Sequence, residues 1–240
     1  TNFYGMEELE KNAMAMKTIT DAIKVRNRII RNLEFALLTD DKAVMNSLMD
    51  FVIVGGGPTG VELAGALSEL KRNVFPKDYT ELDLSQMDIH LVEAGPRLLN
   101  GMSAKASEKA LEYLKKMGVK VHLNLAVKSY NGYEVAFNNG EKILTRTLVW
   151  AAGVKGNPIH GLREECLAKG NRIKVDQFNR VKGYENIFAL GDVAAMEGDS
   201  KFPNGHPMMA PPAMQQGALL AQNLKRTIAS KPMKPFAYKD

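Results

Sequence analysis

The chain has 240 residues, of which 45% are hydrophobic and 25% charged, as is typical of a globular protein. Its 32 basic and 27 acidic residues leave a net charge of +5 with no lysine or arginine run longer than two, which gives no support for a nucleic-acid-binding surface. The single cysteine, Cys166, excludes an internal disulfide and fits a reducing compartment, and no apolar run is long enough to span a membrane.

The first part of the chain predicts one helix. Residues 1–17 are expected to be irregular or extended. Thr18 and Asp21 have the spacing of a capping box, with Asp in place of the usual Glu, so a helix is expected from there to about Leu38. Apolar residues recur behind this cap at helical spacing: Ile23, Ile30, Leu33 and Leu37.

From Asp50 the sequence alternates between strands and helices. Phe51–Val54 is continuously apolar, which is typical of a parallel strand buried on both faces. Pro58 suits the first turn of a helix that runs to about Arg72. The same reading predicts strands at 89–93 and 119–123 and a helix at 105–117. This alternation favours an α/β fold with a Rossmann-like parallel sheet.

The alternation then stops. Asn131-Gly132 and Asn139-Gly140 are strong hairpin turns, so residues 127–145 are expected to form an antiparallel three-stranded meander. An apolar strand follows at 147–152. Beyond it the sequence predicts strands at 172–175 and 186–190 and a helix at Pro212–Ile228. One face of that helix carries four apolar residues: Leu219, Leu220, Leu224 and Ile228.

Gly55, Gly57 and Gly60 follow a strand and open a helix, which is the context that makes a GxGxxG pattern informative. The first glycine permits the tight turn, the second lets the backbone approach a pyrophosphate, and the third allows close packing of helix on strand. Pro58 and Thr59 complete the first helical turn, whose N–H groups attract phosphate. We therefore predict a dinucleotide site, although the pattern alone does not distinguish NAD from FAD.

Glu93 ends the next strand, where a carboxylate can accept both hydroxyls of an adenosine ribose. The polar stretch Asn73–Gln86 explains why Glu93 lies farther than usual from the glycines. A carboxylate there repels a 2′-phosphate, which predicts a preference for NADH over NADPH. Arg97, four residues on, weakens that preference unless it is an ordinary surface charge.

Residues 186–194, Asn-Ile-Phe-Ala-Leu-Gly-Asp-Val-Ala, are a second informative string, because the carboxylate of Asp192 after Gly191 could hydrogen-bond a polyol. An ordinary strand end is an equally good interpretation of the composition. Ile-Phe-Ala-x-Gly-Asp resembles the second FAD motif of the two-dinucleotide flavoprotein reductases, in which the Asp binds the ribitol chain. The meander and the string 150–154, Trp-Ala-Ala-Gly-Val, are similar to that superfamily too. The resemblance implies its three-layer FAD/NAD(P)-binding fold, with an NAD domain inserted into a split FAD domain.

Within that superfamily the chain most resembles type II NADH dehydrogenase, the single-subunit NADH:quinone oxidoreductase. The supporting residues are Thr1–Met6, Gly57–Ala64, Glu93–Arg97 and Ala213–Gly217. The resemblance implies transfer of a hydride from NADH to FAD and of electrons from there to a quinone. One departure concerns the family's AQxAxQ quinone-site string: Pro211 replaces its first Gln, which leaves Gln215 as the matching amide and puts the acceptor in doubt.

The resemblance also implies a domain organisation. Residues 1–46 would be a remnant of the FAD-binding domain with a connecting helix, 47–154 the NAD-binding domain, and 155–240 the C-terminal part of the FAD-binding domain. On this reading the chain is a fragment without the first FAD fingerprint or the family's C-terminal membrane-binding helices. We expect such a fragment to be inactive alone and to hold no FAD. The intact enzyme would be cytoplasmic and peripheral on the inner face of the membrane, and a homodimer is a candidate assembly.

Each remaining site residue has a second, structural interpretation. The resemblance places Glu62 near the nicotinamide, though a helix N-terminus favours any carboxylate. Ala152 and Gly153 end a central strand, where small residues would let cofactor rings approach or would simply make a turn. Ala213 lies in the first turn of a helix expected to point at the flavin, and Gln215 would sit beside the quinone or be an ordinary helix residue.

The four histidines, His90, His122, His160 and His206, show no ligand spacing, so we expect no metal. Two other functions stay open: another NAD(P)H-dependent flavoprotein reductase, of the ferredoxin or disulfide type, and a non-catalytic NADH-binding module. A lone cysteine disfavours a disulfide reductase only incompletely, because some carry their cysteine pair in a segment that this chain lacks.

Overall fold

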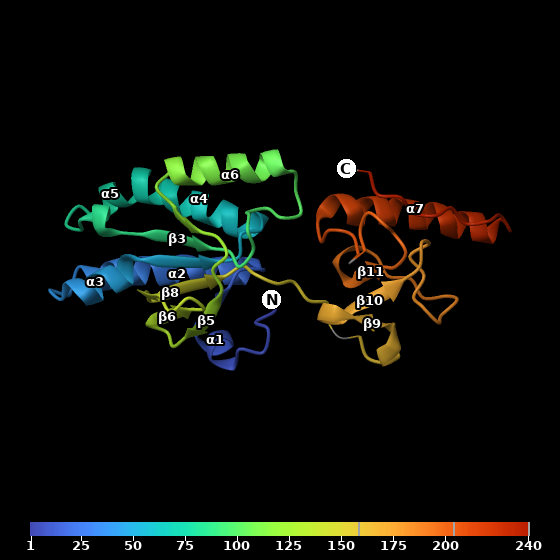
Figure 1. Ribbon diagram of the computed structural model, residues 1–240, viewed down its shortest axis with the longest axis horizontal. Helices are drawn as coiled ribbons and strands as arrows, with labels where there is room; N and C mark the ends of the chain where they lie inside the picture. The colour runs from blue at the N-terminus through green and yellow to red at the C-terminus, as the bar shows by residue number, and fades with distance from the viewer. Residues whose placement is uncertain (158, 204, 240) are drawn as a thin grey trace. The chain divides into compact units, whose positions relative to one another are not determined.

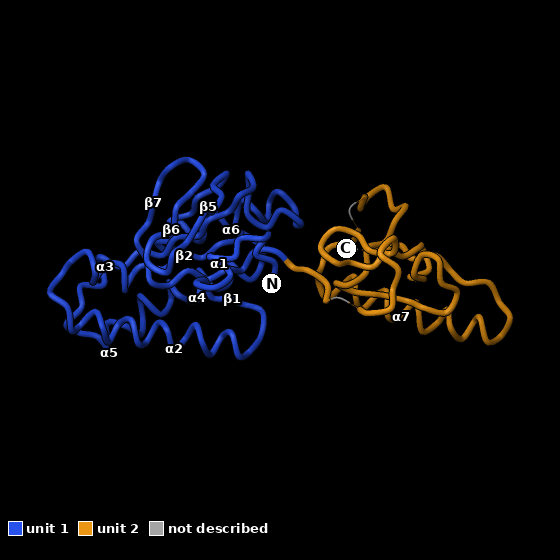
Figure 2. The backbone as a smooth tube through the Cα atoms, turned by 90° about the horizontal axis from the view of Figure 1, so that it is seen from below, with its two compact units in different colours: residues 1–153 blue, residues 154–240 orange. Residues whose placement is uncertain are grey.

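The computed structural model describes residues 1–157, 159–203 and 205–239, so Pro158, Asn204 and Asp240 lie outside it. The chain divides into two compact units, residues 1–153 and 154–240 (Figure 2). Residues 1–46 belong to the same unit as the expected NAD-binding segment. The assignment of 1–46 and 155–240 to a FAD-binding domain stays a prediction.

A five-stranded parallel sheet forms the centre of unit 1, in the order β1-β8-β2-β3-β4. Its strands are β1 (Met14–Ala15), β2 (Phe51–Val54), β3 (Ile89–Val92), β4 (Lys120–His122) and β8 (Thr147–Trp150). Every residue of β2, β3 and β8 is buried. The prediction of an α/β fold built on a buried parallel sheet is confirmed.

Helices cover one face of this sheet (Figure 1). They are α2 (Ile19–Ala36), α3 (Lys42–Met49), α4 (Pro58–Asn73) and α6 (Ala104–Lys116). Phe51 and Ile53 point from β2 into this layer and pack in one cluster with Leu33 of α2 and Leu67 of α4. The alternation of side chains along β2 sends the residues between them to the other face.

The expected meander covers that other face (Figure 1). Its strands are β5 (Val127–Tyr130), β6 (Glu134–Phe137) and β7 (Lys142–Leu144), paired antiparallel. Gly132 and Gly140 take φ of +92° and +87° in the two turns, which explains why glycine stands there. Val52 and Val54 of β2 pack against Tyr130 in this layer. The three-layer arrangement predicted from the sequence is therefore present in unit 1.

The N-terminal segment is more regular than expected. Residues 1–17 contain α1 (Glu7–Asn12) and β1, which adds a strand to the sheet edge beside β8. The capping box at Thr18 and Asp21 is present, and α2 follows it. Its buried face is offset from the expected one, because Ile23 and Ile30 are 45% and 41% exposed while other residues pack inward: Val25, Ile29, Leu33 and Ala36.

The stretch between α4 and β3 holds a short helix, α5 (Phe75–Asp78), and a 3-10 turn at Leu84–Gln86. Phe75 and Met87 are buried in the main core. The long spacing between the glycine turn and Glu93 therefore reflects a packed insertion.

Unit 2 contains a small sheet in the order β11-β10-β9, formed by β9 (Leu167–Ala168), β10 (Arg172–Val175) and β11 (Ala194–Met196). Its core includes the buried free cysteine Cys166 together with Ile173, Val175 and Phe236. Helix α7 (Ala210–Ile228) begins two residues before the expected start.

Two expectations for unit 2 are wrong in detail. Residues 186–190 form no strand beyond an isolated bridge from Phe188 to Arg180. The backbone there is satisfied instead by Asn179, which accepts from the N–H of Ala189 and whose side chain donates to the carbonyl of Ala189. On α7, the buried residues are Pro212, Gln216 and Asn223, whereas Leu224 and Ile228 of the expected apolar face are 42% and 87% exposed.

Candidate functional site

The ends of three neighbouring strands meet at the carboxyl edge of the unit 1 sheet. Val54 of β2 pairs in register with Val92 of β3 on one side and with Trp150 of β8 on the other. The direction of chain order reverses between β2 and β8. Strands β3 and β4 lie on one side of β2, whereas β8 and β1 lie on its other side. In open α/β sheets ligands bind in the crevice at such a switch point. The glycine turn, Glu93 and Ala152-Gly153 are therefore brought to one edge.

Two glycines of the turn are required by packing. At Gly55, which has φ +114°, a Cβ would lie 2.8 Å from the backbone nitrogen of Ala152. At Gly60 a Cβ would lie 1.9 Å from the carbonyl oxygen of Gly55, inside any allowed contact. Both positions exclude side chains because the turn, the helix and β8 approach closely there.

Gly57 is different, because among the described residues no atom beyond its own chain neighbours lies within 4 Å of a Cβ built on it. Its φ of −75° is open to any residue, so neither packing nor backbone conformation requires glycine. Gly57 is the N-cap of α4, no side chain caps the helix there, and Pro58 and Thr59 are exposed in its first turn. The N–H groups of that turn thus face open space, which is the arrangement that receives a phosphate.

The carboxylate of Glu93 is held by the backbone. One oxygen accepts from the N–H of Gly56 and the other from the N–H of Gly95, each at 2.6 Å. Each oxygen retains lone-pair capacity, and the side chain stays half-buried beside the turn. Arg97 is turned to Asn100, donating to its side-chain and backbone oxygens at 3.0 and 2.8 Å. The acid, and not the arginine, lies against the glycine turn.

The other residues expected at this edge have structural contacts as well. Gly153 has φ +71°, and a Cβ there would lie 2.8 Å from the hydroxyl of Tyr4 and 3.0 Å from the carbonyl of Asn2. The packing of the first residues against β8 therefore accounts for this glycine by itself. Ala152 is half-buried beside Gly55, and Glu62 is exposed on the first turns of α4. Their roles toward a cofactor stay predictions.

In unit 2 the Gly191-Asp192 turn packs on the start of α7. Gly191 has φ +70°, and a Cβ there would come within 3.3 Å of the Cβ of Ala213. The N–H of Gly191 donates to the side-chain carbonyl of Gln216 at 2.7 Å. Asp192 is half-buried and acts electrostatically on the guanidinium of Arg172. Burial lowers the pKa of Arg172, and the charge of Asp192 opposes that shift.

Gln216 is the residue that sequence reasoning missed. It is 2% exposed and fixes the Gly191 turn, whereas Gln215 is turned to the end of the chain. The amide of Gln215 donates to the carbonyl of Lys239 at 2.7 Å and accepts from its N–H at 3.1 Å. The hint in the sequence was the 3.6-residue period, which puts Gln216 on the same side of α7 as Pro212.

Comparisons with known proteins agree with this geometry. A profile of the pyridine nucleotide-disulphide oxidoreductases matches residues 4–217, and so includes the glycine turn, the meander and the Gly191-Asp192 string. The chain belongs to the pyridine nucleotide-disulphide oxidoreductase family. The family is named in part for disulphide chemistry, but this sequence contains a single cysteine, Cys166, and therefore no cysteine pair.

Relatives of this pyridine nucleotide-disulphide oxidoreductase are named for NADH oxidation. The type II NADH:quinone oxidoreductase Ndh of Mycobacterium tuberculosis is 31% identical over the whole chain, which covers 52% of that protein. A probable NADH dehydrogenase of Dictyostelium discoideum is 32% identical over 99% of the chain and is covered to 52%. The chain therefore spans about half the length of the curated relatives it matches.

Solved structures share the fold. The NDH2 of Plasmodium falciparum, solved with NADH, matches all of this chain with a TM-score of 0.87 at 19% identity, and 64% of its own chain is covered. A ferredoxin reductase of Rhodopseudomonas palustris matches all of this chain with a TM-score of 0.65 at 17% identity, with 52% of its chain covered. The FAD/NAD-binding reductase fold is thus confirmed. Among the described residues, no helix has the length and apolar character needed to cross a membrane.

Proposed function

We propose that unit 1 binds NADH in the crevice at the carboxyl edge of its parallel sheet. The observation that carries the proposal is Gly57, which no packing contact or backbone angle requires and which leaves open the space before the first turn of α4. The pyrophosphate would lie there, against backbone N–H groups at the positive end of the helix dipole.

The adenosine ribose would be bound by Glu93. Its carboxylate is fixed by the N–H groups of Gly56 and Gly95, so it is oriented before the ligand arrives. An ionised carboxylate repels a 2′-phosphate, and Arg97, which would attract one, is engaged by Asn100. These contacts support a preference for NADH over NADPH.

We further propose that the protein to which this chain belongs passes a hydride from NADH to FAD and then electrons to a quinone. The names of the relatives support this activity. In unit 2 the residues fit a flavin: the Gly191 turn lies against the first turn of α7, Asp192 follows it, and none of the described side chains caps that helix. Asp192 would hold the ribitol chain, and the start of α7, around Ala213, would stabilise negative charge on a bound reduced flavin.

Hydride transfer requires little acid–base chemistry from the protein, so orientation is its main contribution. Bound FAD supplies the redox chemistry that no side chain of this sequence provides. Glu62 would lie near the nicotinamide, Ala152 and Gly153 would leave room for the cofactor rings, and Gln215 would lie near the quinone. Gln215 would first have to release Lys239.

The setting of the enzyme is part of the same proposal. It would be cytoplasmic and bound peripherally to the inner face of a membrane, through segments other than those described, and it could act as a homodimer. The second candidate is another reductase of the family, which the fold likeness to a ferredoxin reductase supports.

The experiment that tests the function is an assay of the full-length protein with its flavin. We expect NADH oxidation to be much faster with a short-chain quinone than with ferredoxin or a disulfide. Equal or greater activity with ferredoxin or a disulfide would favour the second candidate, and NADH binding without turnover by any acceptor would favour a non-catalytic module.

A further inference from the structure

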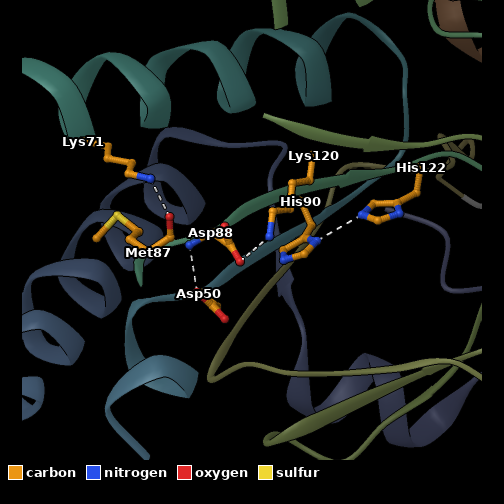
Figure 3. Close-up of polar contacts among 7 residues, drawn as sticks. All are labelled: Asp50, Lys71, Met87, Asp88, His90, Lys120 and His122. Atoms are coloured by element: carbon orange, nitrogen blue, oxygen red, sulfur yellow. Dashed lines mark hydrogen bonds and ion pairs between the residues drawn. The ribbon is translucent and has the colours of Figure 1, made fainter. Parts of the chain in front are cut away.

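A second polar cluster lies at the opposite edge of the parallel sheet of unit 1, where the strands begin. Asp50 precedes β2, Asp88 precedes β3, and His90 is the second residue of β3 (Figure 3). One ligand atom from each lies within 4.8 Å of the other two. The four residues of β2 put roughly 13 Å of strand between this cluster and the glycine turn, so the two sites are separate.

His90 is the feature that an ordinary ion-pair network does not explain. Its side chain is 7% exposed, and its Nδ1 lies 3.0 Å from Nε2 of His122 on the neighbouring strand. The other ring nitrogen of His90, Nε2, lies on the side of the two aspartates (Figure 3). It forms no hydrogen bond with the described parts of the chain. The nitrogen of a neutral imidazole that bears no hydrogen offers a lone pair, so His90 can act as a ligand on this side.

The two carboxylates already have partners, but each keeps an oxygen for a ligand. Asp50 accepts from the N–H of Asp88 at 2.8 Å through one oxygen. Asp88 forms an ion pair with Nζ of Lys120 at 2.5 Å through Oδ2. The side chain of Lys120 is 52% exposed and is free to swing into solvent. Lys71, the other cation facing Asp50, donates to the carbonyl of Met87 at 2.6 Å.

We propose that Asp50, Asp88 and His90 bind one divalent metal ion of the zinc class, and that Lys120 leaves Asp88 when the ion enters. Two carboxylate oxygens and one imidazole nitrogen suit such an ion, with water completing its coordination. Tetrahedral ligands bonded to one ion at ~2.1 Å lie about 3.4 Å apart, so ligand atoms that are up to 4.8 Å apart must approach one another by as much as about 1.4 Å when the ion binds.

His122 would orient the ring of His90 by a hydrogen bond on the side away from the metal ion. With hydrogen on Nδ1 of His90 donated to Nε2 of His122, the remaining nitrogen of His90 carries the lone pair toward the aspartates. The ion would tie together the starts of β2 and β3. It would be structural and would take no part in hydride transfer. The proposal departs from the expectation of no metal, which rested on histidine spacing alone.

The test is calorimetric titration of the metal-free chain with Zn²⁺ at pH 7. We expect one equivalent to bind, and Asp50→Asn to weaken binding at least tenfold, because the amide oxygen still accepts from the N–H of Asp88 but the charge is lost. His90→Gln should weaken binding similarly. Lys120→Met should tighten it severalfold by removing the competing ammonium. His160→Ala, at an exposed histidine outside the cluster, is the matched control and should bind as the original chain does.

Two further readouts separate a metal site from a purely structural network. Co²⁺ should give visible absorption bands that Asp50→Asn abolishes, and Zn²⁺ should raise the melting temperature of the original chain but not of that variant. No stoichiometric binding, unchanged affinity in Asp50→Asn, or weaker binding in Lys120→Met would each overturn the proposal. If His90→Gln fails to fold by circular dichroism, Asp50→Asn and Lys120→Met decide the outcome.

Discussion

The carboxylate of Glu93 accepts a 2.6 Å hydrogen bond from the backbone N–H of Gly56, in the middle of the glycine turn. The contact joins the ends of β2 and β3 and holds the acid beside the space in front of α4. A residue 37 positions away in sequence is thereby part of the turn before any ligand binds. Such preorganisation lowers the entropic cost of binding a dinucleotide.

Replacing Glu93 with alanine is expected to weaken NADH binding at least about tenfold, because a charge-assisted hydrogen bond to the ribose is worth about 1.5–3 kcal/mol. The ratio of NADPH to NADH affinity should rise, since the repulsion of a 2′-phosphate is removed. Calorimetry with both nucleotides measures this. Glu69→Ala, at an exposed acid of α4, is the control and should leave both affinities unchanged. An unaltered NADH affinity in Glu93→Ala would remove this residue from the site.

Gly57→Ala should separate binding from folding. A methyl group there meets no atom within 4 Å, so we expect stability to change by less than about 1 kcal/mol while NADH binding is lost or strongly reduced. Gly60→Ala is the contrasting variant, because its methyl group would lie 1.9 Å from a carbonyl oxygen and should cost more than about 2 kcal/mol. Urea unfolding and NADH titration of both variants check this. Normal NADH affinity in Gly57→Ala would mean that the space in front of α4 is not the phosphate site.

The chain as it stands is expected to bind NADH weakly and to be colourless after purification. Gly55–Gly60 is the one GxGxxG pattern in its sequence, and unit 2 supplies only the Gly191-Asp192 turn and α7 toward a flavin. The visible absorption spectrum of the purified chain tests this. Flavin bands at a stoichiometric level would show that the chain holds FAD unaided.

Gln216→Ala is expected to destabilise unit 2 by about 1–3 kcal/mol, because the partly buried N–H of Gly191 loses its acceptor. Gln215→Ala should cost less, since the contacts of that amide with Lys239 are exposed. Thermal unfolding of the two variants compares them directly. A larger loss in Gln215→Ala would contradict the assignment of Gln216 to the turn.

Thr18→Ala should destabilise α2 by about 1 kcal/mol through loss of the capping box. The pKa of Asp21 is lowered, since hydrogen bonds from Thr18 and Lys17 outweigh the opposing effect of its slight burial. The contribution of this carboxylate is therefore present above its unfolded pKa of about 4 and is lost as the pH falls below it. Unfolding at pH 7 and pH 3 should show a smaller effect of Asp21→Ala at the lower pH, and an equal effect at both would argue against the cap.

The layers of unit 1 could be predicted because each rests on a local pattern. Phe51–Val54 is apolar at every position, and the Asn-Gly turns mark the hairpins without reference to the rest of the chain. The features that were missed depend on long-range contacts. β1 is a strand only because β8 lies beside it. Residues 186–190 do not form one, because Ala189 forms hydrogen bonds with both the backbone and the side chain of Asn179.

The candidate site divides in the same way. The glycine turn has a spacing that can be read directly, and Glu93 could be placed because it ends an apolar strand. The cluster of Asp50, Asp88 and His90 could not, since its members come together only through the pairing of β2 with β3. Gln216 was missed because its neighbour Gln215 matches the quinone-site string of type II NADH dehydrogenases, whereas the helical period decides which of the two glutamines faces Gly191.

The most direct test of the account is a crystal structure of the chain soaked with NADH. We predict that the diphosphate lies against the backbone N–H groups of Gly57, Thr59 and Gly60 and that both hydroxyls of the adenosine ribose are bound by Glu93. A nucleotide bound elsewhere, or an empty crevice at a saturating NADH concentration, would contradict it.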